Sequence, residues 1–218
     1  MCFSPEADVA TAVVVGALGI DAWRHVDLAR ERPLAALPLV LAAHQLIQAF
    51  VWWGLRGEIS SVLWRSASWL YLAIAFGVLP VLVPVAVEAL ESAPRRPRMS
   101  VFVALGAVVS ALLMYCIVRG PIHARIEGHH IVYAIDLWHG GVVTALYVVA
   151  TCGALVLSEH RYVRRFGAVN LVAVLLLVWL DVDGFISLWC AWAAVVSVAI
   201  ALHLRLRPAA GAAATTPP

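Results

Sequence analysis

The 218-residue chain contains no lysine, and all fifteen of its basic residues are arginine. A retinal photoreceptor holds its chromophore as a Schiff base on a lysine amine, so the standard chemistry of that seven-helix class is excluded. Charge of either sign is scarce, because 13% of the residues are charged and 63% are apolar. In soluble domains about a quarter of the residues are charged, and the composition therefore predicts an integral membrane protein.

Further absences limit the function. The arginines occur in short groups instead of forming one basic face, and the net charge is only +2, so nothing predicts nucleic-acid binding. The first residues lack the positive stretch and the cleavage pattern of a signal peptide, and we expect the amino terminus to be retained. The four cysteines have neither CxxC nor Cys/His metal spacing.

Seven apolar segments are long enough to cross a membrane as helices. A helix needs roughly 20 mostly apolar residues to cross about 30 Å of hydrocarbon. The predicted fold is therefore an all-α bundle of seven transmembrane helices over residues 1–207, followed by a disordered tail over 208–218 that is rich in Ala, Pro and Thr. The predicted spans are residues 5–23, 34–55, 66–88, 100–119, 137–157, 166–183 and 185–206.

The arginines give these spans an orientation. Eleven follow the odd-numbered spans and four lie on the opposite side, and the positive-inside rule places the richer side in the cytoplasm. We expect a multi-pass protein of the plasma (inner) membrane, with its amino terminus outside and its carboxyl terminus cytoplasmic. The larger group is Arg24, Arg30, Arg32, Arg95, Arg96, Arg98, Arg161, Arg164, Arg165, Arg205 and Arg207, and the smaller is Arg56, Arg65, Arg119 and Arg125.

A short pattern occurs twice in the chain. Val51-Trp52 followed by Gly57-x-Ile59-Ser60 recurs as Val178-Trp179 followed by Gly184-x-Ile186-Ser187. One interpretation is a three-one-three plan in which spans 1–3 and 5–7 are parallel copies, as in some transporters. Chance similarity is the alternative.

The connection between spans 4 and 5 alternates apolar and polar residues with a period of two. This pattern favours a short β-hairpin that lies over the outer ends of the helices, and an irregular loop is the alternative. The apolar positions are Ile122, Ala124 and Ile126 before Gly128, and Ile131, Tyr133 and Ile135 after it.

Span 2 carries polar residues where a bilayer makes them unfavourable. His44, Gln48 and Trp52 follow one another at i, i+4 and i+8, so they line one helix face directed at the bundle interior. With Gln45, and with Tyr133 from the outer connection, they form the predicted binding site for a small solute or ion. Hydrogen bonding that only holds the helices together is the alternative.

A second polar group is predicted at the outer ends of the helices. Asp136 and His139 are spaced i, i+3, which allows a carboxylate to orient an imidazole. Together with His130 they are the candidate ligands of a divalent metal such as zinc, and a solvated rim is the alternative. Other members of the group are His123, His129, Tyr133, Asp181 and Asp183.

The predicted topology also brings two cysteines to the outer side. Cys2 lies just outside the membrane and Cys190 is less than two turns into span 7 from that side. A disulfide between them is one interpretation. Free thiols, or a different pairing that uses Cys116, are the alternatives.

Five segments of the chain carry a resemblance: Met1-Cys2-Phe3-Ser4, Gln45-Leu46-Ile47-Gln48 with Trp52, His130-Ile131-x-Tyr133, Phe166-Gly167-x-x-Asn170 and Phe185-Ile186-Ser187-Leu188-Trp189-Cys190. With these segments the chain resembles a family of uncharacterised prokaryotic multi-span membrane proteins that begin with Met-Cys-Phe-Ser. The resemblance implies a membrane protein without an established function. The family tends to carry Gln-Gln and then Glu-Gly in span 2, where this chain has His44-Gln45 and Gln48-Ala49. An amide in place of Glu removes any activity that needs a carboxyl proton.

We favour a nonenzymatic function in which a polar pocket, open to the outer side, binds or moves a small solute or ion. The predicted partners are the lipid bilayer and a small solute or lipid. One alternative is a metal-dependent hydrolase of the ceramidase and adiponectin-receptor type, using His44, His130, His139 and Asp136, with Ser110 less well placed. A noncatalytic membrane scaffold is the other.

Overall fold

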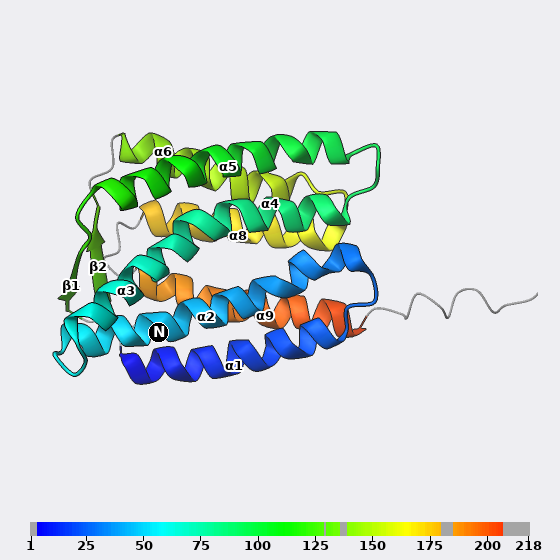
Figure 1. Ribbon diagram of the computed structural model, residues 1–218. Helices are drawn as coiled ribbons and strands as arrows, with labels where there is room; N and C mark the ends of the chain where they lie inside the picture. Colours follow the sequence, from blue (N-terminus) through cyan, green and yellow to red (C-terminus); the bar gives the residue numbers. More distant parts are fainter. Residues whose placement is uncertain (1–3, 129, 136–138, 180–184, 207–218) are drawn as a thin grey trace, which may run out of the picture.

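A computed structural model describes residues 4–128, 130–135, 139–179 and 185–206, and these residues are mostly helical (Figure 1). The helices follow one another as seven rods, two of which contain a wider π-helical segment. A 3₁₀ turn, η1 (Ala29–Glu31), precedes the second rod. The rods are α1 (Pro5–Arg24), α2 (Arg32–Leu55), α3 (Ser61–Leu72) with η2 (Ala73–Val78) and α4 (Leu79–Leu90), α5 (Arg96–Arg119), α6 (Gly140–Val148) with η3 (Val149–Gly153) and α7 (Ala154–Val156), α8 (Arg161–Trp179), and α9 (Phe185–Leu206).

The rods agree with the predicted segments to within about a turn and a half of helix at every described boundary. Within the described residues, three rods are long and apolar enough to cross a membrane. They are Ala29–Leu55, which joins η1 to α2, Ser61–Leu90 and Arg96–Arg119. The helical class is therefore confirmed, while a seven-fold crossing stays a prediction. The tail over 208–218 lies outside the described residues, as does part of the second copy of the repeated pattern.

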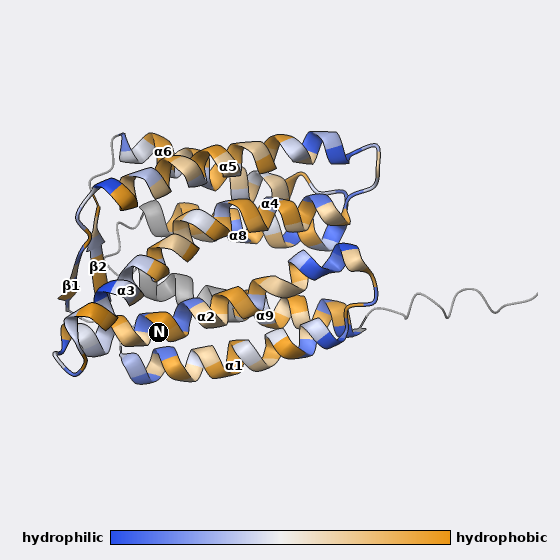
Figure 2. Ribbon diagram, viewed as in Figure 1, coloured by the Kyte–Doolittle hydropathy of each residue, from blue (hydrophilic) through white to orange (hydrophobic). Residues whose placement is uncertain are grey.

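The arginines separate the two ends of the bundle. Ten of the described arginines lie where α1 and α9 end, where α2, α5 and α8 begin, and in the turn before α5 (Figure 1). We call this the arginine-rich end. The opposite end, where α2 and α5 end and α3 begins, holds the small sheet and is called the hairpin end. Figure 2 shows hydrophilic residues gathered at both ends and apolar residues along the rods between them.

Apolar side chains occupy both the faces where the rods contact one another and the faces that are exposed. Val15, Leu41, Leu79 and Ile200 belong to one buried cluster that joins α1, α2, α4 and α9. Large apolar side chains on other faces are exposed, and Val13 of α1 has 67% of its surface accessible. A soluble monomer rarely exposes contiguous apolar surface of this extent, so these faces favour contact with lipid. The exposed positions include Val101, Val108, Leu112, Val118, Val172 and Leu175.

The predicted hairpin is confirmed. β1 (His123–Glu127) and β2 (His130–Ala134) pair in antiparallel register, with Ala124 opposite Tyr133 and Ile126 opposite Ile131. Gly128 adopts a positive φ of 57° in the turn, where glycine has no steric penalty. Ile131 is fully buried against Val51 and Ala67 of the helices below. The apolar face of the hairpin therefore covers the ends of α2 and α3.

Local sequence signals set the turn between α2 and α3. Gly57 has a φ of 79° and donates its N–H to the carbonyl of Gly54, while the N–H of Glu58 donates to the carbonyl of Trp53. This is a Schellman motif, which satisfies the last carbonyls of a helix and favours glycine at this position. Ser60 then caps α3 by accepting from the N–H of Leu63.

Side chains of neighbouring rods complete the wider turn η2. In a π-helical pattern the carbonyl of Ala75 would pair with the N–H of residue 80, but Pro80 has none. The hydroxyl of Tyr147 from α6 donates to that carbonyl instead, at 3.0 Å. Ser110 of α5 likewise donates to the carbonyl of Gly77 at 2.8 Å. In an apolar surrounding such contacts replace the water that an open backbone group needs.

Two glutamates connect the turns at the arginine-rich end by reciprocal hydrogen bonds. The buried carboxylate of Glu91 accepts from the hydroxyl of Ser158 at 2.5 Å and from the N–H of Glu159. Glu159 in return accepts from the N–H and hydroxyl of Ser92, at 2.8 and 2.9 Å, and lies 3.6 Å from Arg95. Each acid therefore satisfies donors in the other turn, which ties α4 to the beginning of α8.

We predict that Gly106→Ala destabilises the bundle, because a Cβ at this position of α5 would lie 2.0 Å from the carbonyl oxygen of Pro80. Overpacking of this kind costs about 1–3 kcal/mol. Thermal unfolding in detergent measures the effect. Gly141→Ala is the matched control, because nothing lies within 4 Å of its Cβ and it is also helical. Equal melting temperatures for the two variants would contradict the packing described here.

We predict that the stability contributed by Glu159 depends on pH. The backbone and hydroxyl hydrogen bonds from Ser92 hold the pKa of Glu159 below its ordinary value of 4.5. A lowered folded-state pKa adds stability above the ordinary pKa, and that stability is lost as the pH falls through the lowered value. Wild type should therefore melt at a higher temperature than Glu159→Gln at neutral pH. The difference should shrink below pH 4.5, and a gap that stays constant to about pH 3 would refute the assignment.

Candidate functional site

The polar face of α2 is buried, as its spacing predicts. His44, Gln48 and Trp52 have 4%, 0% and 2% of their surface accessible. Gln45 is buried at 1% and has an interaction partner. The rod therefore places a column of polar groups against its neighbours in the half of the bundle near the hairpin end.

Three residues from other elements meet this face. Asp8 of α1 is fully buried, and Tyr71 of α3 stacks on His44 with ring centroids 3.8 Å apart and planes at 18°. On its other side Tyr71 stacks on Tyr133 of β2, with centroids 5.0 Å apart. A column of three rings thus runs from α2 through α3 to the hairpin, and it fixes the positions of the polar atoms at both of its ends.

Several buried polar atoms of this group lack a hydrogen bond of good geometry. Buried polar groups almost always have a hydrogen-bond partner, and an unmet donor or acceptor costs about 1–3 kcal/mol. Within the part of the chain that the structure describes, seven buried side-chain atoms have none: Asp8 Oδ1 and Oδ2, His44 Nε2, Gln48 Oε1 and Nε2, Trp52 Nε1 and the Tyr133 hydroxyl. We call Asp8, His44, Gln48, Trp52, Tyr71 and Tyr133 the buried polar cluster.

Tyr133 interacts electrostatically with two other members of the cluster. Burial raises the pKa of the Tyr133 hydroxyl well above its ordinary value of 10, and the neighbouring Tyr71 and Asp8 raise it further. The hydroxyl therefore stays neutral at physiological pH and offers both a donor and an acceptor. Asp8 is the acid that acts on this hydroxyl, and no ion pair joins Asp8 to another described residue.

The cluster also includes groups that the sequence pattern does not reveal. Asp8 lies in the first turn of α1, close to the predicted boundary of span 1, where an acid is ordinarily read as a helix-end residue. Tyr71 looks like one of many aromatic residues in an apolar span. The sequence does indicate that such groups exist, because the polar residues at i, i+4 and i+8 of α2 need polar neighbours on other helices.

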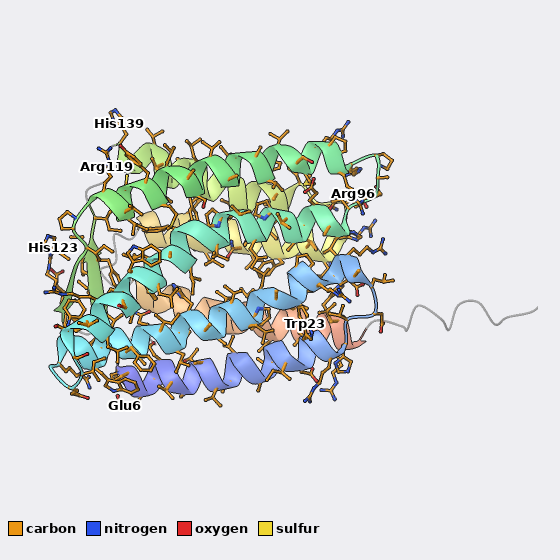
Figure 3. The ribbon with its side chains drawn as sticks, in the orientation of Figure 1. Glu6, Trp23, Arg96, Arg119, His123 and His139 are labelled. Atoms are coloured by element: carbon orange, nitrogen blue, oxygen red, sulfur yellow. The ribbon has the colours of Figure 1, made fainter. Side chains whose placement is uncertain are left out.

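The predicted metal ligands are only partly described. His130 begins β2 and is half-buried, whereas His139 precedes α6, is exposed and has a positive φ of 52°. Figure 3 shows His123 and His139 at the hairpin end. Asp136 lies outside the described residues. Among the described residues no three His, Cys, Asp or Glu side chains gather closely enough to hold a metal, so the zinc site stays a prediction.

The cysteine prediction is likewise not tested. Cys2 lies outside the described residues, and the side chain of Cys190 is not described. Cys116 is half-buried and Cys152 is buried, and both are free thiols. Cys152 accepts a hydrogen bond from the amide nitrogen of Asn170 at 3.2 Å, which joins η3 to α8.

A family model matches residues 1–215, which is nearly the whole chain. The chain belongs to DUF6629, a family of unknown function. The resemblance to an uncharacterised family is thereby confirmed. Neither the curated proteins nor the solved structures contain a match to this DUF6629 chain.

We predict that Gln48→Leu raises the melting temperature of the DUF6629 protein in buffer without added ligand. Leucine removes two buried polar atoms that have no partner, and so recovers the penalty of about 1–3 kcal/mol that they carry. Gln45→Leu is the matched control: Gln45 is equally buried and has a partner, so its replacement should be destabilising. Destabilisation by Gln48→Leu of the same size as the control would show that the Gln48 amide is satisfied in the protein.

Proposed function

We propose that this protein is a seven-span protein of the plasma membrane that binds a small cation in the buried polar cluster. The arginine-rich end would lie in the cytoplasm, according to the positive-inside rule, and the hairpin end would face outward. The observation that carries this proposal is a buried acid, Asp8, that forms no ion pair with another described residue and has Trp52, Tyr71 and Tyr133 as neighbours.

The charge of Asp8 favours a cation over a neutral solute. An enclosed carboxylate is very unfavourable in a low-dielectric surrounding unless a positive group or several hydrogen bonds compensate it. No described residue forms an ion pair with its oxygens, and its neighbouring donor, the indole N–H of Trp52, is neutral. A bound cation would supply the missing charge, and the Gln48 carbonyl and Tyr133 hydroxyl would add neutral oxygen ligands of the kind that hard cations prefer.

The burial of the cluster limits the size of the ligand. Asp8 and Gln48 have no accessible surface and Trp52 has 2%, so the ligand would be enclosed on all sides. This favours a monovalent inorganic cation, or ammonium, over a sugar or a lipid headgroup. Tyr133 and the fully buried Ile131 place the hairpin between the cluster and the outer side, so exchange would require the hairpin to move.

A purely structural role accounts for the cluster less well. Polar groups that hold membrane helices together do so by bonding to one another across the interface. Here both amide atoms of Gln48 lack such a bond within the described part of the chain. Trp52 and the Tyr71 backbone are neighbours of Asp8 and His44, but neither brings a positive charge to the acid.

Cation-dependent thermal stability tests the proposal. Purified protein would be melted in the presence of lithium, sodium, potassium or ammonium chloride, with choline chloride at equal ionic strength as the reference. Ligands that bind only the folded state raise its stability by about 2.7 kcal/mol at 100 times the dissociation constant. We expect at least one of the four cations to raise the melting temperature over choline, and Asp8→Asn to abolish the rise.

Glu6→Gln is the matched control for Asp8→Asn. Glu6 is on the same helix and also carries a carboxylate, but 75% of its side chain is exposed and it lies 3.9 Å from Arg56. The control should keep the full cation response. The proposal fails if none of the cations acts beyond choline, or if Asp8→Asn responds as strongly as wild type.

A further inference from the structure

A second site lies at the other end of the bundle and does not depend on the cation proposal. A cavity of about 100 Å³ opens between α2, α4, α8 and α9. Apolar side chains from all four helices line it, including Leu41, Val83, Val163 and Ile200. Its lining differs from the buried polar cluster in composition, and it shares no residue with that cluster.

The few polar residues in the lining use their donors elsewhere. Tyr162 donates its hydroxyl to the carbonyl of Ala199 at 2.5 Å, and Thr151 donates to the carbonyl of Tyr147 at 2.9 Å. Tyr147 itself donates to a carbonyl of η2, and the amide nitrogen of Asn170, which also lines the cavity, donates to the sulfur of Cys152. The hydroxyl hydrogens are therefore not available to a ligand. A cavity with such a surface binds apolar groups rather than water or a polar solute.

The cavity reaches the terminal turns of three helices at the arginine-rich end. Leu34 is in the first turn of α2, Leu90 is the last residue of α4, and Tyr162 is the second residue of α8, and all three line the cavity. The cavity therefore extends to the level of the helix ends, where the arginines lie.

Exposed arginines flank these lining residues. Arg32 begins α2 and is exposed, and Arg161, Arg164 and Arg165 lie in the first two turns of α8 and are exposed. Within the described ranges none of the four forms an ion pair. Guanidinium groups bind phosphate oxygens in a bidentate way. An anion with an apolar chain would therefore match both the rim and the interior.

We propose that an anionic phospholipid binds here, with part of one acyl chain in the cavity and its phosphate at the arginines of α2 and α8. Basic pockets between membrane helices on the cytoplasmic side are a recognised form of lipid site. The proposal commits to a lipid because the two halves of the site differ. The rim favours negative charge, and the interior, lined mostly by apolar side chains, favours hydrocarbon.

Binding of defined lipids tests this site. Native mass spectrometry and thermal unfolding of the full chain in detergent would compare phosphatidylglycerol, phosphatidylcholine and glycerol phosphate, which carries the phosphate without acyl chains. We expect phosphatidylglycerol alone to remain bound and to raise the melting temperature. Equal binding of phosphatidylcholine would overturn the role of the arginines, and equal stabilisation by glycerol phosphate would overturn the role of the cavity.

Two variants separate the rim from the interior. Arg161→Gln with Arg164→Gln should weaken phosphatidylglycerol binding at least tenfold, whereas Arg119→Gln with Arg125→Gln, the same loss of charge at the hairpin end, should leave it unchanged. Ala199→Leu adds volume at a half-buried lining position and should also weaken binding. Equal losses in the two arginine pairs would show a general charge effect. Full binding in a folded Ala199→Leu variant would likewise overturn the proposal.

Discussion

Nearly every feature of this structure follows from the need to satisfy polar groups without water. The backbone meets it through helices, and Tyr147 and Ser110 meet it where Pro80 and the wide turn leave carbonyls open. At the arginine-rich end the carboxylates of Glu91 and Glu159 each accept hydrogen bonds from donors in the other's turn. In the buried polar cluster several described polar atoms lack a hydrogen bond of good geometry, and this contrast with the pairing elsewhere is the reason for proposing a ligand there.

The sequence predicts the features that depend on composition and period. Apolar runs locate the helical rods, because lipid and neighbouring helices both favour apolar side chains. Each rod therefore ends where the sequence becomes polar. The alternation around Gly128 predicts the hairpin because one of its faces is buried and the other is wet. The spacing of His44, Gln48 and Trp52 predicts a buried face for the same reason, and burial confirms it.

Contacts between distant segments could not be predicted in this way. Asp8 joins the cluster only because α1 packs along α2, and its position in the first turn of α1 looks like that of an ordinary helix-end acid. The pairing of Glu91 with Ser158 spans 67 residues. Pro80 predicts a disturbed helix, but the wide turn that accommodates it depends on a hydroxyl from α6. In each case the deciding partner lies on another rod, about which a periodic pattern gives no information.

The rod formed by α3, η2 and α4 connects the two proposed sites. Tyr71 lies just before the wide turn and belongs to the polar cluster, whereas Leu79 and Val83 lie just after it and line the apolar cavity. A π-helical turn changes the angular phase of the residues that follow it relative to a regular helix. The same rod can therefore direct an aromatic polar face toward α2 near the hairpin end and an apolar face toward α8 and α9 near the arginine-rich end. The proline and the hydroxyls that support this turn thus hold the two proposed sites in separate orientations on one rod.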